Sequence, residues 1–350
     1  MPLVDTTYME NNSPTYIIFG ASGDLSKRYL LTALKNMNYA GNIVPISRKD
    51  YGNLKNLIPG KGEKIFHLAI PPAGVEEAVE LIYNNFTKDN SGNIKIILEK
   101  PFGNNLESAK KLITHINKYF SEEQIYRVDH YLAKQSLQKV VTENWEKKDI
   151  ASIQILASEK IDIEGRVSFY EQTGALKDFV QSHLIEMTAV TLSQSFQPHQ
   201  REQALKNINI VCDISKQECV KRGQYEGYRN EVENPTSMTE TFVSIHLMSS
   251  DPIWREVSIT LSTGKALSDK RTQIIIKYKD GSEKIFNIEH EPGAYEKVIA
   301  SVIANQHNLF ISDGEILQSW RILNAIEQTW ASSTNDLIFY AKGSDIGDIM

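Results

Sequence analysis

The feature that most constrains the fold is a strand, a glycine turn and a helix in direct succession near the start of the chain. The apolar run Tyr16–Phe19 is followed by Gly20, by Gly23 and by a helical pattern from Leu25 to about Tyr39. A helix that begins after such a turn offers unpaired N–H groups and the positive end of its dipole, which suits a dinucleotide pyrophosphate. The G-x-x-G spacing is weak by itself, because many strand–helix turns contain two glycines.

Strand and helix continue to alternate through the first part of the chain. Strands are predicted at 43–46, 65–70 and 94–98, with a helix at 75–86. This alternation favours a parallel sheet covered on both faces. We therefore predict an α/β Rossmann-like dinucleotide-binding domain at residues 15–128, preceded by a flexible N-terminus at 1–14.

The pattern changes near residue 130. Helices are predicted at about 130–148 and 174–195, and amphipathic helices at 294–304 and 314–329 close the chain. Residues 129–350 are thus expected to form an α+β domain that binds the substrate, with a mainly antiparallel sheet and a possible role in dimerisation. The strands expected in that sheet are 151–157, 239–248, 257–262, 273–278 and 283–288.

Composition excludes several classes of function. The 350 residues carry a net charge of −6 and no basic tract, so we expect no nucleic-acid partner. No apolar run is long enough to span a bilayer, so no membrane association is expected. Cys212 and Cys219 lack any metal-ligand pattern and suit reduced thiols in a cytosol. We therefore predict a soluble cytoplasmic protein without a metal site.

A nine-residue segment, Arg127–Gln135, carries a dense set of polar groups. Written as a helix, it places His130 and Lys134 on one face with Tyr131 beside them. Such a face can donate several hydrogen bonds to a dianionic phosphate. The segment resembles R-I-D-H-Y-L-G-K-E, the substrate signature of the glucose-6-phosphate dehydrogenase family, and its three departures leave every charged or aromatic contact in place.

The glycine turn also resembles this family. Residues 20–27 read G-A-S-G-D-L-S-K, close to the family's cofactor signature G-A-S-G-D-L-A-K. After the second predicted strand, Ser47 and Arg48 stand where an arginine accommodates a 2′-phosphate, which favours NADP, although Asp50 nearby could reduce the local charge. A solvated basic turn is the alternative interpretation. The resemblance implies that the cofactor contacts come from Gly20, Ser22, Gly23, Asp24, Leu25, Ser47, Arg48, Pro71 and Lys100.

Two further motifs follow the third and fourth predicted strands. His67–Pro72 reads H-L-A-I-P-P and resembles the family's Y-L-A-x-P-P, while Glu99–Gly103 matches E-K-P-F-G without change. A strand end delivers Lys100 to the carboxyl edge of the sheet, where open α/β proteins bind ligands. The resemblance implies that Lys100 contacts both substrate and cofactor, and that the bond before Pro101 is cis.

The resemblance singles out one of eight histidines as a base. Residues 174–184 are similar to the family's G-I-I-R-D-V-M-Q-N-H-L helix, whose histidine is the general base, and His183 matches it. Oxidation of a hemiacetal hydroxyl needs such a base, and imidazole titrates near neutrality. The resemblance implies that Asp129 pairs with His183 and that Asp178 and Glu159 bind sugar hydroxyls.

Two lysines complete the set implied by the resemblance. Lys265 matches the family's G-K-A-L segment and Lys270 matches a basic position five residues later, where lysine helps to hold the sugar phosphate. Read without the resemblance, the segment is about equally well explained as a charged hairpin end.

The chain is much shorter than usual members of this family. Residues 49–66 replace a large helical piece, and the segment between Phe286 and Pro292 lacks the further strands and a substrate-binding glutamine. The usual dimer is therefore in doubt, although a homodimer or higher oligomer is possible. The resemblance implies NADP-dependent oxidation of glucose 6-phosphate to 6-phosphoglucono-1,5-lactone. The alternatives are the same chemistry on another 6-phosphorylated aldose in a specialised biosynthetic pathway, or a non-catalytic NADP-binding protein.

Overall fold

The protein is represented by a computed structural model that describes residues 13–87, 92–210, 212–214, 219–333 and 336–350. The chain divides into two compact units. The first contains residues up to Ala133 together with Pro292–Asp313, and the second contains Lys134–Glu291 and Gly314–Met350. The segment 292–313 thus belongs to the first unit, whereas the sequence pattern predicted one domain for all residues after 128.

The first unit is built on a sheet with the strand order β13-β5-β4-β3-β1-β2. All neighbouring strands are parallel except β13, which is antiparallel to β5. Because β1 lies between β2 and β3, the strand order reverses there, and open α/β sheets bind ligands at such a point. The strands are β1 (Thr15–Phe19), β2 (Ile43–Ile46), β3 (Lys64–Leu68), β4 (Ile94–Leu98), β5 (Ile125–Val128) and β13 (Phe310–Ile311).

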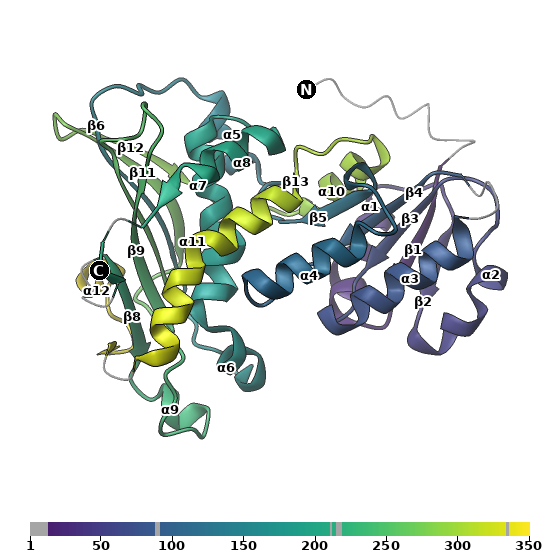
Figure 1. Cartoon of the computed structure of the whole chain (residues 1–350), viewed down its shortest axis with the longest axis horizontal. Coiled ribbons are helices and arrows are strands. Elements are labelled where there is room, and N and C mark those ends of the chain that lie inside the picture. Colours follow the sequence, from purple (N-terminus) through teal and green to yellow (C-terminus); the bar gives the residue numbers. More distant parts are fainter. Residues whose placement is uncertain (1–12, 88–91, 211, 215–218, 334–335) are drawn as a thin grey trace. The chain divides into compact units, whose positions relative to one another are not determined.

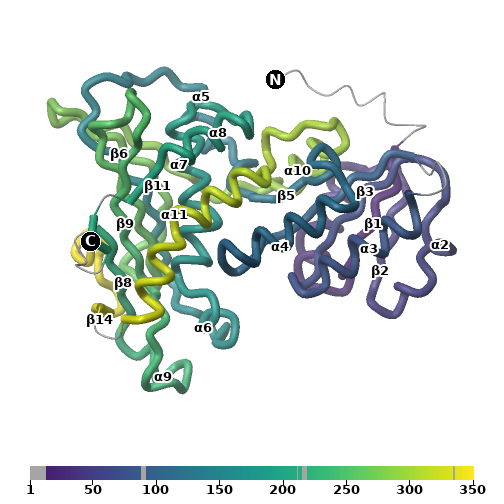
Figure 2. The backbone as a smooth tube through the Cα atoms, in the orientation of Figure 1, coloured from purple at the N-terminus to yellow at the C-terminus, as the bar shows by residue number. Residues whose placement is uncertain are grey.

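Helices cover both faces of this sheet, so its central strands are buried along their whole length. On one face, α1 and α10 join a core cluster that includes Tyr16 and Ile65. On the other, Phe66 packs against Phe86 of α3 with ring centroids 5.5 Å apart. Figure 2 shows this alternation of strand and helix along the chain. The helices are α1 (Leu31–Asn36), α2 (Leu54–Leu57), α3 (Val75–Phe86), α4 (Leu106–Ile116) and α10 (Ala294–Ile303).

The second unit is built on a mainly antiparallel sheet with the order β12-β11-β6-β10-β9-β8-β14, and β7 pairs with β9. Two of its pairings, β6 with β10 and β8 with β14, are parallel. This agrees with the predicted α+β class. The strands are β6 (Ile150–Ser158), β7 (Ile208–Asn209), β8 (Val220–Tyr225), β9 (Phe242–Ser249), β10 (Ser258–Gly264), β11 (Arg271–Tyr278), β12 (Glu283–Asn287) and β14 (Leu337–Tyr340).

One helical layer of the second unit lies against this sheet (Figure 1). Its centre is a continuous run in which a π-helical segment, Leu176–Leu184, leads into α7, whose residues are almost all buried. Within the described residues, no helix is both long enough and apolar enough to cross a membrane. The helices are α5 (Gln135–Thr142), α6 (Val167–Ala175), α7 (Ile185–Ser193), α8 (Pro198–Lys206), α9 (Tyr228–Glu231), α11 (Asp313–Ser332) and α12 (Ile346–Ile349).

Two expectations from the sequence are corrected. The helix predicted at 130–148 is only α5, since residues 130–133 form a turn and Lys134 has extended backbone angles. His130 and Lys134 therefore do not share a helix face. Cys212 and Cys219, expected as reduced thiols, are joined by a disulfide.

Candidate active site

The glycine turn after β1 has a conformation that requires glycine. Gly20 has a φ of +80°, and a Cβ added there would lie 2.2 Å from the carbonyl oxygen of Ala69. The Gly20 N–H donates to the carbonyl of Ile46 at 2.9 Å. The turn is thus fixed between the ends of β2 and β3, while Ser22 and Asp24 remain exposed. An exposed turn at a helix start, beside the point where strand order reverses, fits a dinucleotide pyrophosphate.

The residues after β2 differ in how available they are to a cofactor. Ser47 Oγ donates to a carboxylate oxygen of Asp50 at 2.6 Å, and its N–H donates to the same oxygen at 2.9 Å. These bonds hold the pKa of the Asp50 carboxyl below its ordinary value. Arg48 is highly exposed and lies 3.4 Å from Glu77, an exposed ion pair of little strength. Arg48 is therefore accessible to an anion, whereas the Ser47 hydroxyl proton is already donated.

The ends of β3 and β4 carry the two proline motifs. Pro71 is exposed and Lys100 is half-buried. The peptide bond between Lys100 and Pro101 is cis, which confirms the expectation for Pro101. Directly before Lys100, the Glu99 carboxylate contacts His67 Nε2 at 2.8 Å. His67 lies near the end of β3, and the other residues follow β3 or β4 at the carboxyl edge of the parallel sheet.

The segment after β5 is held by a local turn around Asp129. One carboxylate oxygen of this buried residue accepts the Tyr131 N–H at 2.9 Å, and its carbonyl accepts the N–H of Leu132 at 3.1 Å. Tyr131 and Lys134 are buried, while His130 is half-buried. Side-chain bonding to the main chain two residues on is typical of aspartate in turns. The carboxylate of Asp129 therefore has a fixed direction.

The π-helical segment of the second unit carries Asp178 and His183. Its geometry was not predicted, although a helix was, and such segments occur often at functional sites. Gln181 donates to Ser319 of α11 at 3.0 Å, which fixes the segment against its neighbour. The ring of His183, 5% exposed, lies edge-on to Phe179 with centroids 5.2 Å apart. His183 is thus buried on a rigid element.

Lys265 connects two of the predicted carboxylates. Its ammonium forms an ion pair with Glu159 and lies 3.9 Å from a carboxylate oxygen of Asp178. It also lies 5.4 Å from the centroid of the Tyr170 ring. Lys265 is only 2% exposed, so its charge is balanced by these groups. Lys270, five residues later, is exposed.

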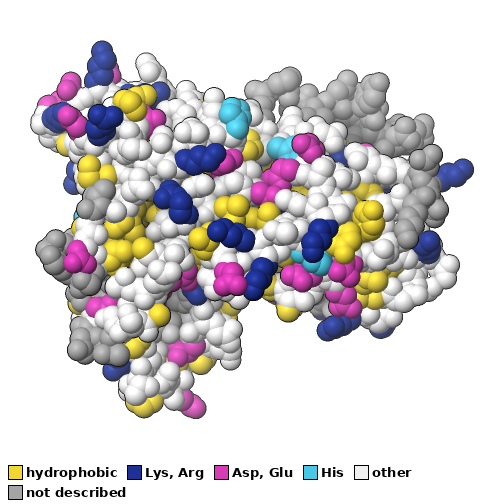
Figure 3. All heavy atoms as spheres, viewed as in Figure 1, with side chains coloured by type: hydrophobic (Ala, Val, Ile, Leu, Met, Phe, Trp, Pro, Cys, Tyr) yellow, Lys and Arg dark blue, Asp and Glu magenta, His cyan; other side chains and the backbone are white. Residues whose placement is uncertain are grey.

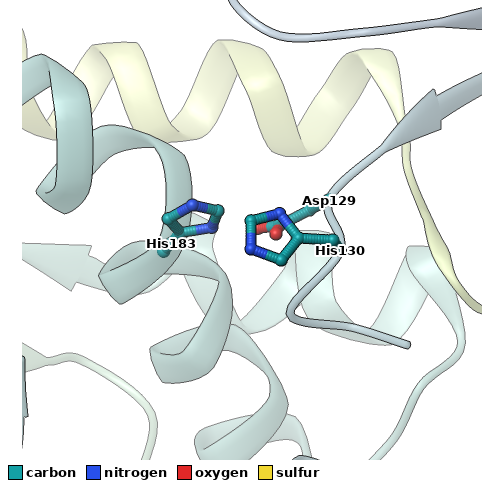
Figure 4. Close-up of side chains that lie close together, drawn as sticks. All are labelled: Asp129, His130 and His183. Atoms are coloured by element: carbon teal, nitrogen blue, oxygen red, sulfur yellow. The ribbon is translucent and has the colours of Figure 1, made fainter. Parts of the chain in front are cut away.

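Figure 4 shows the side chains of Asp129, His130 and His183. Asp129 and His130 come from the segment after β5, and His183 from the π-helical segment.

Two groups beside Lys265 and the π-helical segment are not part of any motif recognised in the sequence. Glu240, just before β9, contacts the start of the π-helical segment, and Tyr170 of α6 covers Lys265. Neither belongs to a local motif with an evident chemical role, because each becomes relevant only through contacts with residues far along the chain. The face drawn in Figure 3 shows basic and acidic side chains interspersed.

Comparisons with known proteins identify the family and support the fold. Residues 45–139 match the family model described as "Glucose-6-phosphate dehydrogenase, NAD binding domain", and residues 135–292 and 287–348 match "Glucose-6-phosphate dehydrogenase, C-terminal domain". A solved structure titled "Glucose-6-phosphate dehydrogenase in complex with its substrate glucose-6-phosphate" has a TM-score of 0.83, covers 96% of both chains and is 20% identical, which supports the fold.

Two curated relatives illustrate the similarity in sequence. Glucose-6-phosphate 1-dehydrogenase 5, cytoplasmic, of Arabidopsis thaliana is 34% identical over 261 residues, which are 70% of this chain and 50% of the relative. Glucose-6-phosphate 1-dehydrogenase of Bacillus subtilis is 25% identical over 94% of both chains. The match thus spans about half the length of the plant relative. Both domain matches and the plant relative lead to one conclusion: the chain belongs to the glucose-6-phosphate dehydrogenase family.

Proposed function

We propose that this protein is an oxidoreductase that acts on a CH–OH group, oxidising glucose 6-phosphate at C1 to 6-phosphoglucono-1,5-lactone with NADP. His183 is the general base and Asp129 its partner. The observation that carries the proposal is the cluster of Lys265, Glu159 and Asp178. Glu159 directly follows β6, Asp178 lies in the π-helical segment and Lys265 directly follows β10. The polar side chains of three family motifs thus meet at the element that bears the proposed base.

The reaction removes a proton and a hydride from the sugar. His183 accepts the proton of the C1 hydroxyl while the C1 hydrogen departs as hydride, and the C1–O bond becomes the carbonyl of the lactone. The oxidised nicotinamide of the cofactor, when bound, accepts the hydride. Asp129 orients the imidazole and stabilises its protonated form, since a carboxylate beside an imidazole favours the charged state.

The remaining site residues hold the substrate. His130, Tyr131 and Lys134 supply hydrogen-bond donors to the phosphate, with Lys270 as an exposed cation and Lys100 between sugar and cofactor. Glu159 and Asp178 accept bonds from sugar hydroxyls. The balanced charge of Lys265 suits it to orienting these two carboxylates as well as to contacting the sugar.

The proposed preference for NADP rests on Arg48. Its exposed side chain follows β2, where an arginine accommodates a 2′-phosphate. Gly20, Ser22, Gly23, Asp24 and Leu25 form the pyrophosphate turn, and Ser47 and Pro71 border it. The family match to an NAD-binding domain supports a nicotinamide dinucleotide.

A second candidate is the same chemistry on a different 6-phosphorylated aldose. It is favoured by the short connection between β12, which ends at Asn287, and α10, which begins at Ala294. When a sugar site lacks one buried polar contact, its binding free energies for different sugars can differ by a few kcal/mol less. A non-catalytic NADP-binding protein is disfavoured because His183, Asp129 and Lys134 are all retained. We also propose a cytoplasmic location; homo-oligomerisation remains a prediction.

The test is the absorbance of reduced nicotinamide with purified protein, NADP⁺ and glucose 6-phosphate. Parallel reactions contain NAD⁺, unphosphorylated glucose, and the 2-amino, 3-amino and epimeric 6-phosphates. Rapid reduction of NADP⁺ with glucose 6-phosphate is expected. Turnover of only another phosphorylated sugar would favour the second candidate, and no turnover despite NADPH binding would favour the non-catalytic one.

A further inference from the structure

The π-helical segment that carries Asp178 and His183 begins at a sharp break in the helical run. At Gly174 the backbone has φ +60° and ψ 178°, so α6 does not continue smoothly into the segment. The first N–H groups after such a break lack partners within the helix. Ala175 and Leu176 are the residues whose N–H groups need acceptors from elsewhere in the unit.

Both acceptors come from Glu240. Its carbonyl accepts the Ala175 N–H at 2.9 Å, and its carboxylate accepts the Leu176 N–H at 2.9 Å. A Cβ added at Gly174 would lie 2.2 Å from the same carboxylate, so only glycine leaves room for this contact. Glu240 thus caps the segment from a site 64 residues away in sequence.

The residues just before β9, which include Glu240, also hold Lys265, another residue of the candidate sugar site. The carbonyl of Thr241, the next residue, accepts the N–H of Lys265 at 2.9 Å, and Thr241 donates its own N–H to Gly223 of β8 at 2.7 Å. Residues 240–241 therefore fix the main chain at both Leu176 and Lys265. A displacement at Glu240 would move Asp178 relative to Lys265, which now lie 3.9 Å apart.

We propose that Glu240 is a positioning residue for the sugar site, and that the charge of its carboxylate holds the segment 176–184 in its productive place. A negative charge at the N-terminal end of a helical segment is favourable, because it faces the positive end of the peptide dipoles. A neutral group keeps the hydrogen bond and loses that attraction. This inference rests on the proposed function for its kinetic consequence, but the capping role does not.

The surroundings of Glu240 place its change of charge near neutral pH. Burial raises the pKa of the carboxyl to about 7, opposed by the Leu176 N–H and by the charges of Arg222 and Lys177. The phenols of Tyr170 and Tyr228 also face it, and their own pKa values are raised by burial, so they stay neutral. Glu240 therefore holds the segment as an uncharged carboxylic acid below about pH 7 and as a carboxylate above it.

The kinetic test compares Glu240→Gln with the unaltered protein and with Glu226→Gln, which changes an exposed glutamate of the same unit. The measured quantity is the ratio of kcat/KM for glucose 6-phosphate, unaltered protein over variant, from pH 5.5 to 9. Taking this ratio cancels any pH dependence that the two proteins have in common. For Glu240→Gln we expect a ratio near one at pH 5.5 that rises to roughly 3–10 above pH 8, with the affinity for NADPH unchanged. For Glu226→Gln the ratio stays near one throughout.

A second measurement separates this inference from the proposed function. Hydrogen–deuterium exchange at pH 8 is compared for peptides that span 174–184. We expect this segment to exchange faster through local opening in Glu240→Gln, although the Gln variant gains global stability relative to the unaltered protein as the pH rises. Exchange should be faster still in Glu240→Ala. Both results are expected even if no phosphorylated sugar is turned over. Unchanged exchange would overturn the capping role. Changed exchange with a pH-independent ratio in an active enzyme would reduce Glu240 to a structural contact and overturn the proposal.

Discussion

The Nε2 atom of His67 lies 2.8 Å from a carboxylate oxygen of Glu99, and its Nδ1 atom lies 2.6 Å from the hydroxyl of Tyr16. His67 is fully buried, and the other oxygen of Glu99 accepts the hydroxyl of Tyr295 at 3.3 Å. This chain of hydrogen bonds links β1, β3, the end of β4 and α10 within one unit. It fixes the carboxylate next to Lys100, the residue proposed to lie between sugar and cofactor.

We expect His67→Phe to destabilise the first unit by about 1–3 kcal/mol, because it leaves the Glu99 carboxylate without its closest partner. The free energy of unfolding in urea measures this, and the dissociation constant of NADPH reports the effect on the site. His115→Phe is a matched control, since the carboxylates near His115, on Glu76 and Glu80, are about half exposed. Equal stability of the two variants would contradict the role assigned to the His67–Glu99 pair.

His183→Asn tests the base. Loss of a positioned general base lowers turnover by about 10²–10⁴-fold, while NADPH binding remains intact because His183 lies outside the nucleotide turn. Steady-state kinetics with glucose 6-phosphate and fluorescence titration with NADPH measure the two quantities. His199→Asn supplies a control at a histidine that belongs to none of the site motifs. A His183 variant with near-normal turnover would exclude this residue as the base.

Gly20→Ala tests the nucleotide turn. Alanine there is strained by the positive φ and clashes with the Ala69 carbonyl, a combination that costs on the order of 1–3 kcal/mol or shifts the turn. We expect NADPH affinity to fall at least about tenfold, which corresponds to about 1.4 kcal/mol. The control is Gly60→Ala, where the added methyl meets nothing within 4 Å. If both variants bind NADPH alike, the turn does not form the cofactor site.

Local patterns predicted much of the fold. The strands Ile43–Ile46 and Ile94–Leu98 and the helix Val75–Phe86 lie where the apolar periodicity put them. The glycine turn and the cis bond at Pro101 were also anticipated from short motifs. Each of these features is encoded by residues next to one another in the sequence.

The missed features depend on distant contacts. The segment 130–134 has helical periodicity, but the Asp129 side chain bonds to the main chain and forms a turn instead. The return of 292–313 to the first unit is determined by packing of α10 against α1, which no local pattern reports. For the same reason the contact of Glu240 with Leu176 could not be predicted.

Arg48→Ala tests the choice of cofactor. Removal of a cation that binds a 2′-phosphate costs about 1.5–3 kcal/mol, so kcat/KM for NADP⁺ is expected to fall roughly tenfold or more while the value for NAD⁺ changes little. Lys49→Ala, at the adjacent exposed cation, serves as the control. A ratio of NADP⁺ to NAD⁺ efficiency that is the same in both variants would assign the preference to other residues.

The raised pKa of Glu240 also predicts how stability depends on pH. The folded protein holds the carboxyl proton up to about pH 7, whereas an unfolded chain releases it near its ordinary value of 4.5. The folded state therefore binds more protons between these values, so stability is full below about pH 4.5 and falls as the pH rises through 7. The loss is on the order of 3 kcal/mol at most.

Glu240→Gln should abolish this part of the pH dependence. The measured quantity is the free energy of unfolding in urea for the variant minus that for the unaltered protein. This difference is expected to increase as the pH rises from 5 to 8. Glu226→Gln should follow the unaltered protein at every pH. Parallel curves for Glu240→Gln would mean that the carboxyl titrates normally. Above pH 8 we expect Glu240→Gln to gain stability and to lose kcat/KM. This combination is expected if the charge of the Glu240 carboxylate costs folding free energy but orients the site.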